Sequence, residues 1–206
     1  MQRLFQMVQH ARCGLVALVL VAGLQGCAGM LPQQTPGAGE AKPEAADVKK
    51  PLAPMTVDAK TVKHIRRLNK TVTLTDATAY TDFINEASLE FQIDNQLLVA
   101  LISVESMFNI EAASQAGAKG LTQVIPRYHR DKITQAKQKL KLYSIFEPRL
   151  NIYVGAWVLR DYMDSSKSVH VALQKYNGSL DDPSQAYANR VIAVYHSLKA
   201  SGTRSQ

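Results

Sequence analysis

The sequence contains few cysteines and no long apolar run. Cys13 and Cys27 are its only two cysteines in 206 residues, which excludes a disulfide-dense scaffold and a zinc site built from several cysteines. No apolar stretch reaches the roughly 20 residues that a permanent transmembrane helix requires. Strand-like alternation is almost absent, and no internal repeat is visible. The remaining composition, 46% apolar and 20% charged residues, is typical of a folded globular domain.

The first 26 residues have the features of a secretion signal. A start containing arginine precedes an apolar or glycine run over residues 13–24, which is followed by Gln25-Gly26-Cys27. The run has the length of a signal-peptide hydrophobic region. Small residues before a cysteine resemble the lipobox of bacterial lipoproteins, so we expect residues 1–26 to be removed and Cys27 to carry lipid. The alternative is a buried helix with an incidental cysteine.

Two features predict where such a lipoprotein resides. Ala28 follows the cysteine, and the absence of aspartate there resembles sorting to the outer membrane. Residues 27–57 hold five of the eight prolines and show no hydrophobic period, which predicts a flexible linker. A coil of about 30 residues spans roughly 30 Å. We therefore expect a domain at 58–206 that is anchored by lipid on the periplasmic side of the outer membrane.

The charge balance is a weak indication of partners. The whole chain has 24 basic and 17 acidic residues. Loss of residues 1–26 removes two arginines and leaves 22 minus 17, or +5. Nucleic acid is not expected as a partner outside the cytoplasm, so anionic lipid or cell-wall polymer is the favoured partner class.

The sequence from residue 58 onward has helical periodicity. Apolar positions three and four apart predict helices at 58–70, 76–91, 95–107, 133–140, 152–162 and 169–175. Asp94 is predicted to cap the third helix, and Asp182-Pro183 to begin a last one. Residues 109–126 are predicted to form a loop. These elements predict one all-α domain with its own core.

Glu105 is the unusual residue of the 95–107 helix. It falls on the same stripe as Leu98, Leu101 and Ile102. An ionised carboxylate on such a face loses hydration, so burial raises its pKa. A carboxylic acid that stays protonated near neutral pH suits general acid catalysis at a glycosidic oxygen. The alternative is a helix-end glutamate whose side chain bends back to solvent.

Three motifs follow one another around this glutamate. They are Glu105-Ser106, then Gly117-Ala118-Lys119-Gly120-Leu121-Thr122-Gln123, then Tyr176-Asn177-Gly178. Their order and spacing resemble the catalytic domain of the soluble lytic transglycosylases, a lysozyme-like α-fold family that cleaves peptidoglycan. The resemblance covers about residues 85–199. It implies a lysozyme-like fold here and the glycan strands of peptidoglycan as the substrate.

The resemblance also implies roles for individual residues. Glu105 matches the single catalytic acid, and Ser114 a serine that hydrogen-bonds close to it. Gln123 matches a glutamine that contacts substrate, and Tyr176 a tyrosine whose hydroxyl points at the catalytic carboxyl. The alternatives are a loop hydroxyl, a structural amide and a core tyrosine. We also expect substrate contacts from Asn177 in the third motif.

Further positions near the motifs have two possible roles. Met107 and Phe108 either line the sugar groove or pack in the core. Gly117 and Gly120 are expected to permit a positive φ or a close backbone approach. The family usually has methionine where Thr122 stands, and alanine-glycine where Gly178-Ser179 stand. These departures are expected to affect groove shape and turn geometry, but not proton transfer.

The implied mechanism needs one carboxylate and no metal or cofactor. Glu105 acts as acid and then as base, and the sugar's own hydroxyl closes a 1,6-anhydro ring. One alternative is a hydrolase on the same fold, which usually needs a second acid. Another is a non-catalytic lipoprotein that binds glycan or scaffolds an envelope-spanning machine. Finally, the basic segment 127–141 is either a solvated helix face or an attraction site for acidic wall polymer.

Overall fold

The computed structural model describes residues 58–203. Its regular elements in this range are helices: α1 (Ala59–Leu68), α2 (Leu74–Phe91), α3 (Asn95–Glu105), η1 (Pro126–Tyr128), α4 (Arg130–Leu140), α5 (Pro148–Asp164), α6 (Val169–Asn177) and α7 (Ala186–Thr203). The loop before η1 contains only isolated bridges. The all-α prediction is therefore confirmed. The predicted signal peptide at 1–26, the lipidated Cys27 and the linker at 27–57 lie outside the described residues.

Helix ends follow local hydrogen bonds. The Asp94 carboxylate accepts from the Gln96 backbone N–H at 2.9 Å, which confirms the predicted cap of α3. That helix ends at Glu105, two residues earlier than predicted, because Met107 and Phe108 have left-handed backbones with φ of 50° and 60°.

The prediction that α7 begins at Asp182-Pro183 was wrong. The helix begins at Ala186. The Asp182 carboxylate accepts from the Ser184 and Ala186 backbone N–H groups at 2.9 and 3.0 Å, so it closes a turn before the helix.

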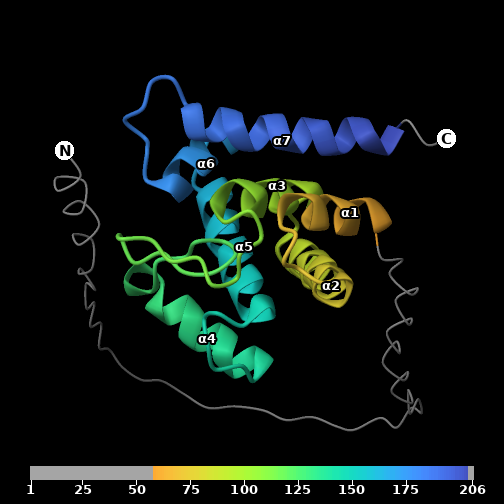
Figure 1. Ribbon diagram of the computed structural model, residues 1–206. Helices are drawn as coiled ribbons and strands as arrows, with labels where there is room; N and C mark the ends of the chain where they lie inside the picture. Colours follow the sequence, from red (N-terminus) through yellow and green to blue (C-terminus); the bar gives the residue numbers. More distant parts are fainter. Residues whose placement is uncertain (1–57, 204–206) are drawn as a thin grey trace, which may run out of the picture. The chain divides into compact units, whose positions relative to one another are not determined.

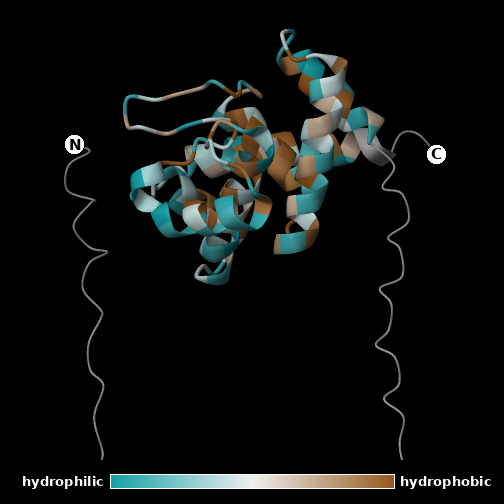
Figure 2. Cartoon of the chain, turned by 90° about the horizontal axis from the view of Figure 1, so that it is seen from below, coloured by the Kyte–Doolittle hydropathy of each residue, from teal (hydrophilic) through white to brown (hydrophobic). Residues whose placement is uncertain are grey.

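Two pairs of helices make the main packing contacts of the domain. Figure 1 shows α5 passing through the middle of the helical region, with α2 on one side and α4 and α6 near its ends. The α2 helix packs on α5, and α3 packs on α7. Nearly every side of α3 is buried, as expected for a helix inside a core. In Figure 2 the hydrophobic residues gather where the helices face one another.

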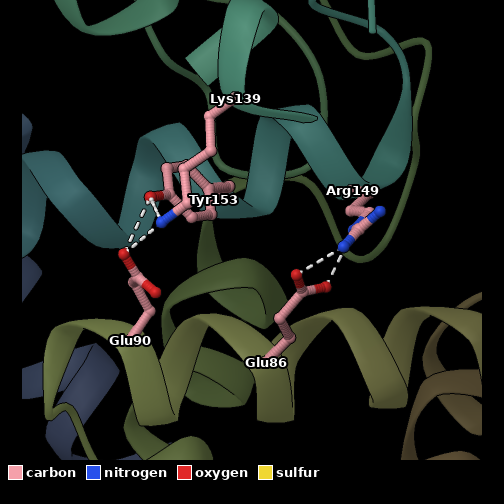
Figure 3. Close-up of polar contacts among 5 residues, drawn as sticks. All are labelled: Glu86, Glu90, Lys139, Arg149 and Tyr153. Carbon is pink, nitrogen blue, oxygen red and sulfur yellow. Dashed lines mark hydrogen bonds and ion pairs between the residues drawn. The ribbon is translucent and has the colours of Figure 1, made fainter. Parts of the chain in front are cut away.

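Ion pairs fix α2 against its neighbours. Glu86 receives two hydrogen bonds from the Arg149 guanidinium of α5, one of them 2.8 Å long. One turn further along α2, Glu90 pairs with Lys139 of α4 and accepts from the Tyr153 hydroxyl of α5 (Figure 3). Within residues 58–203, no helix is both long and apolar enough to cross a membrane.

Candidate functional site

The end of α3 carries the candidate acid. Glu105 is the last residue of this buried helix, and its side chain is half-buried. The hydroxyl of Tyr187, at the start of α7, donates to Glu105 Oε1. Arg190 follows one turn along α7, and its guanidinium lies 6.0 Å from the centre of the Tyr187 ring. Packing of α3 on α7 thus brings together residues that are 82 positions apart.

The surroundings of Glu105 shift its proton affinity. Burial raises the pKa of Glu105 to about 7. The hydrogen bond from Tyr187 and the positive charge of Arg190 act in the opposite direction, and burial outweighs them. The structure therefore favours a buried acid over a side chain that bends back into bulk solvent. Such a group holds its proton near neutral pH and can also release it there.

Tyr176 differs from its predicted arrangement. Its hydroxyl donates to the Thr122 backbone carbonyl at 2.8 Å, so its hydrogen bond does not go to Glu105. The ring still lies in the neighbourhood, because burial and then the Glu105 charge raise the pKa of Tyr176 well above its ordinary value. Tyr187 makes the contact that the sequence analysis assigned to Tyr176. Tyr187 itself was missed because its position only marks the apolar side of α7.

The loop between α3 and η1 is fixed by buried polar groups. The hydroxyl of Ser106, next to the acid, donates to the Leu121 carbonyl at 2.7 Å. Asn151 of α5 is completely buried, and its Oδ1 accepts from the Thr122 backbone N–H at 2.8 Å. Its Nδ2 donates to the carbonyls of Lys119 and Ile145 at 2.9 and 3.0 Å. These bonds hold the second motif against α5 and the end of α3.

Two glycines permit this close approach. Gly120 has a φ of +75°, and an added Cβ would lie 2.3 Å from the Asn151 Nδ2. A Cβ on Gly155 would lie 2.4 Å from the Thr122 Oγ1. Thr122 is itself buried, and its hydroxyl donates toward Asn151. The Thr122 side chain therefore faces α5 inside the protein, and its expected influence on groove shape stays a prediction.

Gln123 and Ser114 serve the backbone of the same loop. The Gln123 amide nitrogen donates to the carbonyls of Ala112 and Gly120 at 3.0 and 2.9 Å. Both of its N–H groups are thereby occupied within the loop, and the substrate contact of Gln123 stays a prediction. The Ser114 hydroxyl accepts from the Ala118 N–H at 3.1 Å. Among residues 58–203, Ser114 has no hydrogen bond to Glu105.

The remaining predicted substrate contacts divide into exposed and buried positions. Met107 is 60% exposed two residues after the acid, whereas Phe108 is completely buried in the core. The structure thus resolves the open alternative for Phe108 in favour of the core. Asn177 is exposed at the end of α6, where its amide donates to the Ser179 hydroxyl at 3.0 Å. Met107 and Asn177, together with the exposed Ser114, are accordingly the predicted contacts that face solvent.

No second carboxylate accompanies Glu105 among the groups that shift its pKa. The three acids nearest in sequence have other environments. Glu90 pairs with α4, and Asp94 caps the opposite end of α3, about 16 Å away along the helix axis. Glu111 is exposed in the loop. Within the described range there is also no group of three or more histidine, cysteine or acidic residues that could hold a metal ion.

Comparisons with known proteins agree on one family. A family model described as the transglycosylase SLT domain matches residues 82–191. A transglycosylase of Enterobacteria phage PRD1 is 30% identical over 105 residues, which cover 51% of this chain and 37% of that protein. The membrane-bound lytic murein transglycosylase C of Actinobacillus succinogenes is 36% identical over 92 residues, covering 41% of this chain and 25% of that protein.

A solved structure shares the fold. The chain is similar to an inactive glutamate-to-glutamine mutant of the lytic transglycosylase Slt from Pseudomonas aeruginosa, with a TM-score of 0.50 and 16% identity. The similarity covers 70% of this chain and 28% of that one. The matched part covers between 25% and 37% of the length of these relatives.

Proposed function

Because this chain belongs to the transglycosylase SLT domain family, we propose that it is a lytic transglycosylase acting on the glycan strands of peptidoglycan. It breaks the β-1,4 bond between N-acetylmuramic acid and N-acetylglucosamine without hydrolysis and leaves a 1,6-anhydromuramic end. The observation that carries the proposal is the half-buried Glu105, whose pKa is raised to about 7 beside Tyr187.

In the first step Glu105 is the general acid. Its carboxyl proton passes to the glycosidic oxygen, the bond from that oxygen to the muramic C1 breaks, and N-acetylglucosamine leaves with a free hydroxyl. Positive charge develops at C1, and the muramic N-acetyl group helps to stabilise it. Glu105 is now a carboxylate, and the Tyr187 hydroxyl and the Arg190 charge stabilise this form.

In the second step Glu105 is the general base. It takes the proton from the C6 hydroxyl of the same muramic residue, and O6 bonds to C1 to close the anhydro ring. Glu105 regains the proton that it gave away, so the cycle ends with the acid restored. The nucleophile already belongs to the substrate, so little entropy is lost.

Two alternatives make different predictions. A hydrolase on the same fold usually needs a second acid, and the environments of Glu90, Asp94 and Glu111 argue against one of them in that role. A non-catalytic wall-binding or scaffolding lipoprotein would have no use for an acid poised near neutrality. The inactivity of a glutamate-to-glutamine mutant in a protein of the same fold supports dependence on one glutamate.

Digestion of purified sacculi followed by mass spectrometry of the fragments separates these functions. Wild type is expected to produce anhydro ends, which are one water lighter than hydrolysed ends. Glu105→Gln is expected to keep the fold and release no fragments. Hydrolysed ends would establish the hydrolase, and full activity of Glu105→Gln would overturn the assignment of the acid.

The cellular location is part of the proposal. We infer that lipid on Cys27 anchors the domain on the periplasmic side of the outer membrane, with an envelope-spanning machine as the proposed assembly partner. Several relatives are named membrane-bound lytic murein transglycosylase C, which supports a membrane-associated location. Growth with a labelled fatty acid is expected to label the wild-type protein but not Cys27→Ser. Absence of label from the wild type would exclude the lipid anchor.

A further inference from the structure

A concave site lies between α2, α4 and α5. It encloses about 430 Å³, within the range of small-molecule sites. None of its lining residues belongs to α3, α6 or α7, the helices that carry Glu105, Tyr176 and Tyr187. On α5, Tyr153 and Trp157 line it. At 100° per residue, they lie on the side of the helix opposite Asn151 and Gly155. The site is therefore separate from the catalytic region.

Aromatic rings form one wall of this pocket. The Phe91 ring centre lies 4.8 Å from that of Tyr153 in an edge-to-face arrangement, and 6.0 Å from that of Trp157 at an interplanar angle of 24°. Phe91 and Trp157 are half-buried and keep part of their surface accessible, whereas Tyr153 is buried. The Lys139 ammonium lies 5.1 Å from the Tyr153 ring centre, and that of Lys132, which pairs with Asp161, lies 5.2 Å from the Trp157 ring centre. Ala136 of α4 lines the pocket beside these rings, and its small side chain is buried. The rings support one another, so this wall is preorganised.

The polar edge of the pocket carries cancelling charges. Lys139 pairs with Glu90 and donates to the Tyr153 hydroxyl at 2.9 Å (Figure 3). The Tyr153 hydroxyl donates to the same Glu90 oxygen at 3.2 Å. A charged ligand would have to compete with this pair. A neutral ligand that presents hydroxyl and amide groups could bind both partners without separating them.

We propose that this pocket binds a neutral N-acetylated sugar ring of the glycan strand. The C–H face of a pyranose ring is apolar and packs on the accessible surface of Phe91 and Trp157. Its hydroxyls reach Glu90, Lys139 and the exposed Gln135 at the edge. The inference rests on the proposed function, because it takes peptidoglycan as the polymer that the domain meets. The pocket would hold the domain on the wall without taking part in bond cleavage.

The chain provides a specific probe for this test. Trp157 is the only tryptophan in the sequence, so intrinsic tryptophan fluorescence reports on the pocket. The full-length protein carrying Glu105→Gln is titrated with the N-acetylglucosamine tetramer. We expect a saturable change in emission. Loss of one hydrogen bond to a charged group in Lys139→Gln should weaken the affinity about fivefold or more.

Lys137→Gln is the matched control. It removes the same charge from α4 at a position that does not line the pocket, so its affinity should equal that of the parent. Gln135→Ala provides a second edge variant, and thermal unfolding verifies the fold of each. No saturable emission change, equal weakening by Lys137→Gln and Lys139→Gln, or saturation by free stem peptide alone would each overturn the inference.

The two proposals fail in distinguishable ways. Anhydro ends from wild-type digestion without a sugar response at Trp157 would refute the pocket and leave the proposed function intact. A pocket response without Glu105-dependent cleavage would refute the catalytic proposal and retain sugar binding.

Discussion

Glu105 and Asn151 are two polar side chains within the same helical core, yet their surroundings differ. The Asn151 side chain hydrogen-bonds through both its oxygen and its nitrogen to groups that hold the loop against α5. Glu105 receives a hydrogen bond from Tyr187, and burial moves its pKa to about 7. A neutral amide with satisfied hydrogen bonds contributes rigidity. A carboxyl held near its own titration point is suited to moving a proton.

The largest expected effect is the loss of stability when Asn151 is replaced. Asn151→Ala leaves the Thr122 N–H and the Lys119 and Ile145 carbonyls without these bonds inside the protein. We expect the free energy of unfolding to fall by about 4 kcal/mol, measured by urea denaturation. A loss below about 1 kcal/mol would show that Asn151 does not hold the loop.

Glu105→Gln should raise the free energy of unfolding at alkaline pH, in contrast to Asn151→Ala. The folded-state pKa of Glu105 is about 7, above the ordinary value of 4.5. The protonated group therefore contributes stability below about pH 4.5, and this contribution is lost as the pH rises through 7. The loss amounts to as much as about 3 kcal/mol. Glutamine does not titrate, so the variant should exceed wild type in stability at pH 8 more than at pH 4. Parallel pH–stability curves would contradict this.

Tyr187→Phe should change the chemistry more than the fold. Without the phenol donor the carboxylate form is less favoured, so the pKa of Glu105 rises further. The basic limb of the pH–rate profile on sacculi should move upward, and kcat should fall about tenfold as Glu105 loses its orientation. A lower kcat with an unmoved limb would mean that Tyr187 acts only through packing.

Tyr176→Phe is the matched comparison and the smallest effect. Its hydroxyl serves the Thr122 carbonyl, so we expect a loss of about 1 kcal/mol in unfolding free energy. The basic limb of the pH–rate profile should stay in place. If Tyr176→Phe moves that limb and Tyr187→Phe does not, the hydroxyl that shifts the pKa of Glu105 belongs to Tyr176 and not to Tyr187.

The helices were predictable because their signals are local. Apolar positions three and four apart predict α3, and Asp94 caps it through a neighbour two residues away. The start of α7 was mispredicted, although it too is local. The same aspartate-proline pair suits a helix start and a turn, and the hydrogen bonds of Asp182 select the turn.

The orientation of the site side chains was not predictable in the same way. Tyr176 and Tyr187 both lie on apolar helix faces, and which hydroxyl reaches Glu105 depends on how α6 and α7 pack against α3. The motif predicts that Gln123 contacts substrate. In the structure its backbone is left-handed, with φ of 50°, and its two amide hydrogens bond to carbonyls of its own loop. The hydrogen-bond partners of these side chains therefore could not be predicted from the motifs alone.

The central claim is that Glu105 holds a proton near neutral pH. Carbon-13 NMR of the glutamate side-chain carboxyls, with Glu105→Gln used to assign the resonance, measures its titration directly. We predict a midpoint at about pH 7. A midpoint near the ordinary 4.5 would show a solvated carboxylate and contradict the proposed acid.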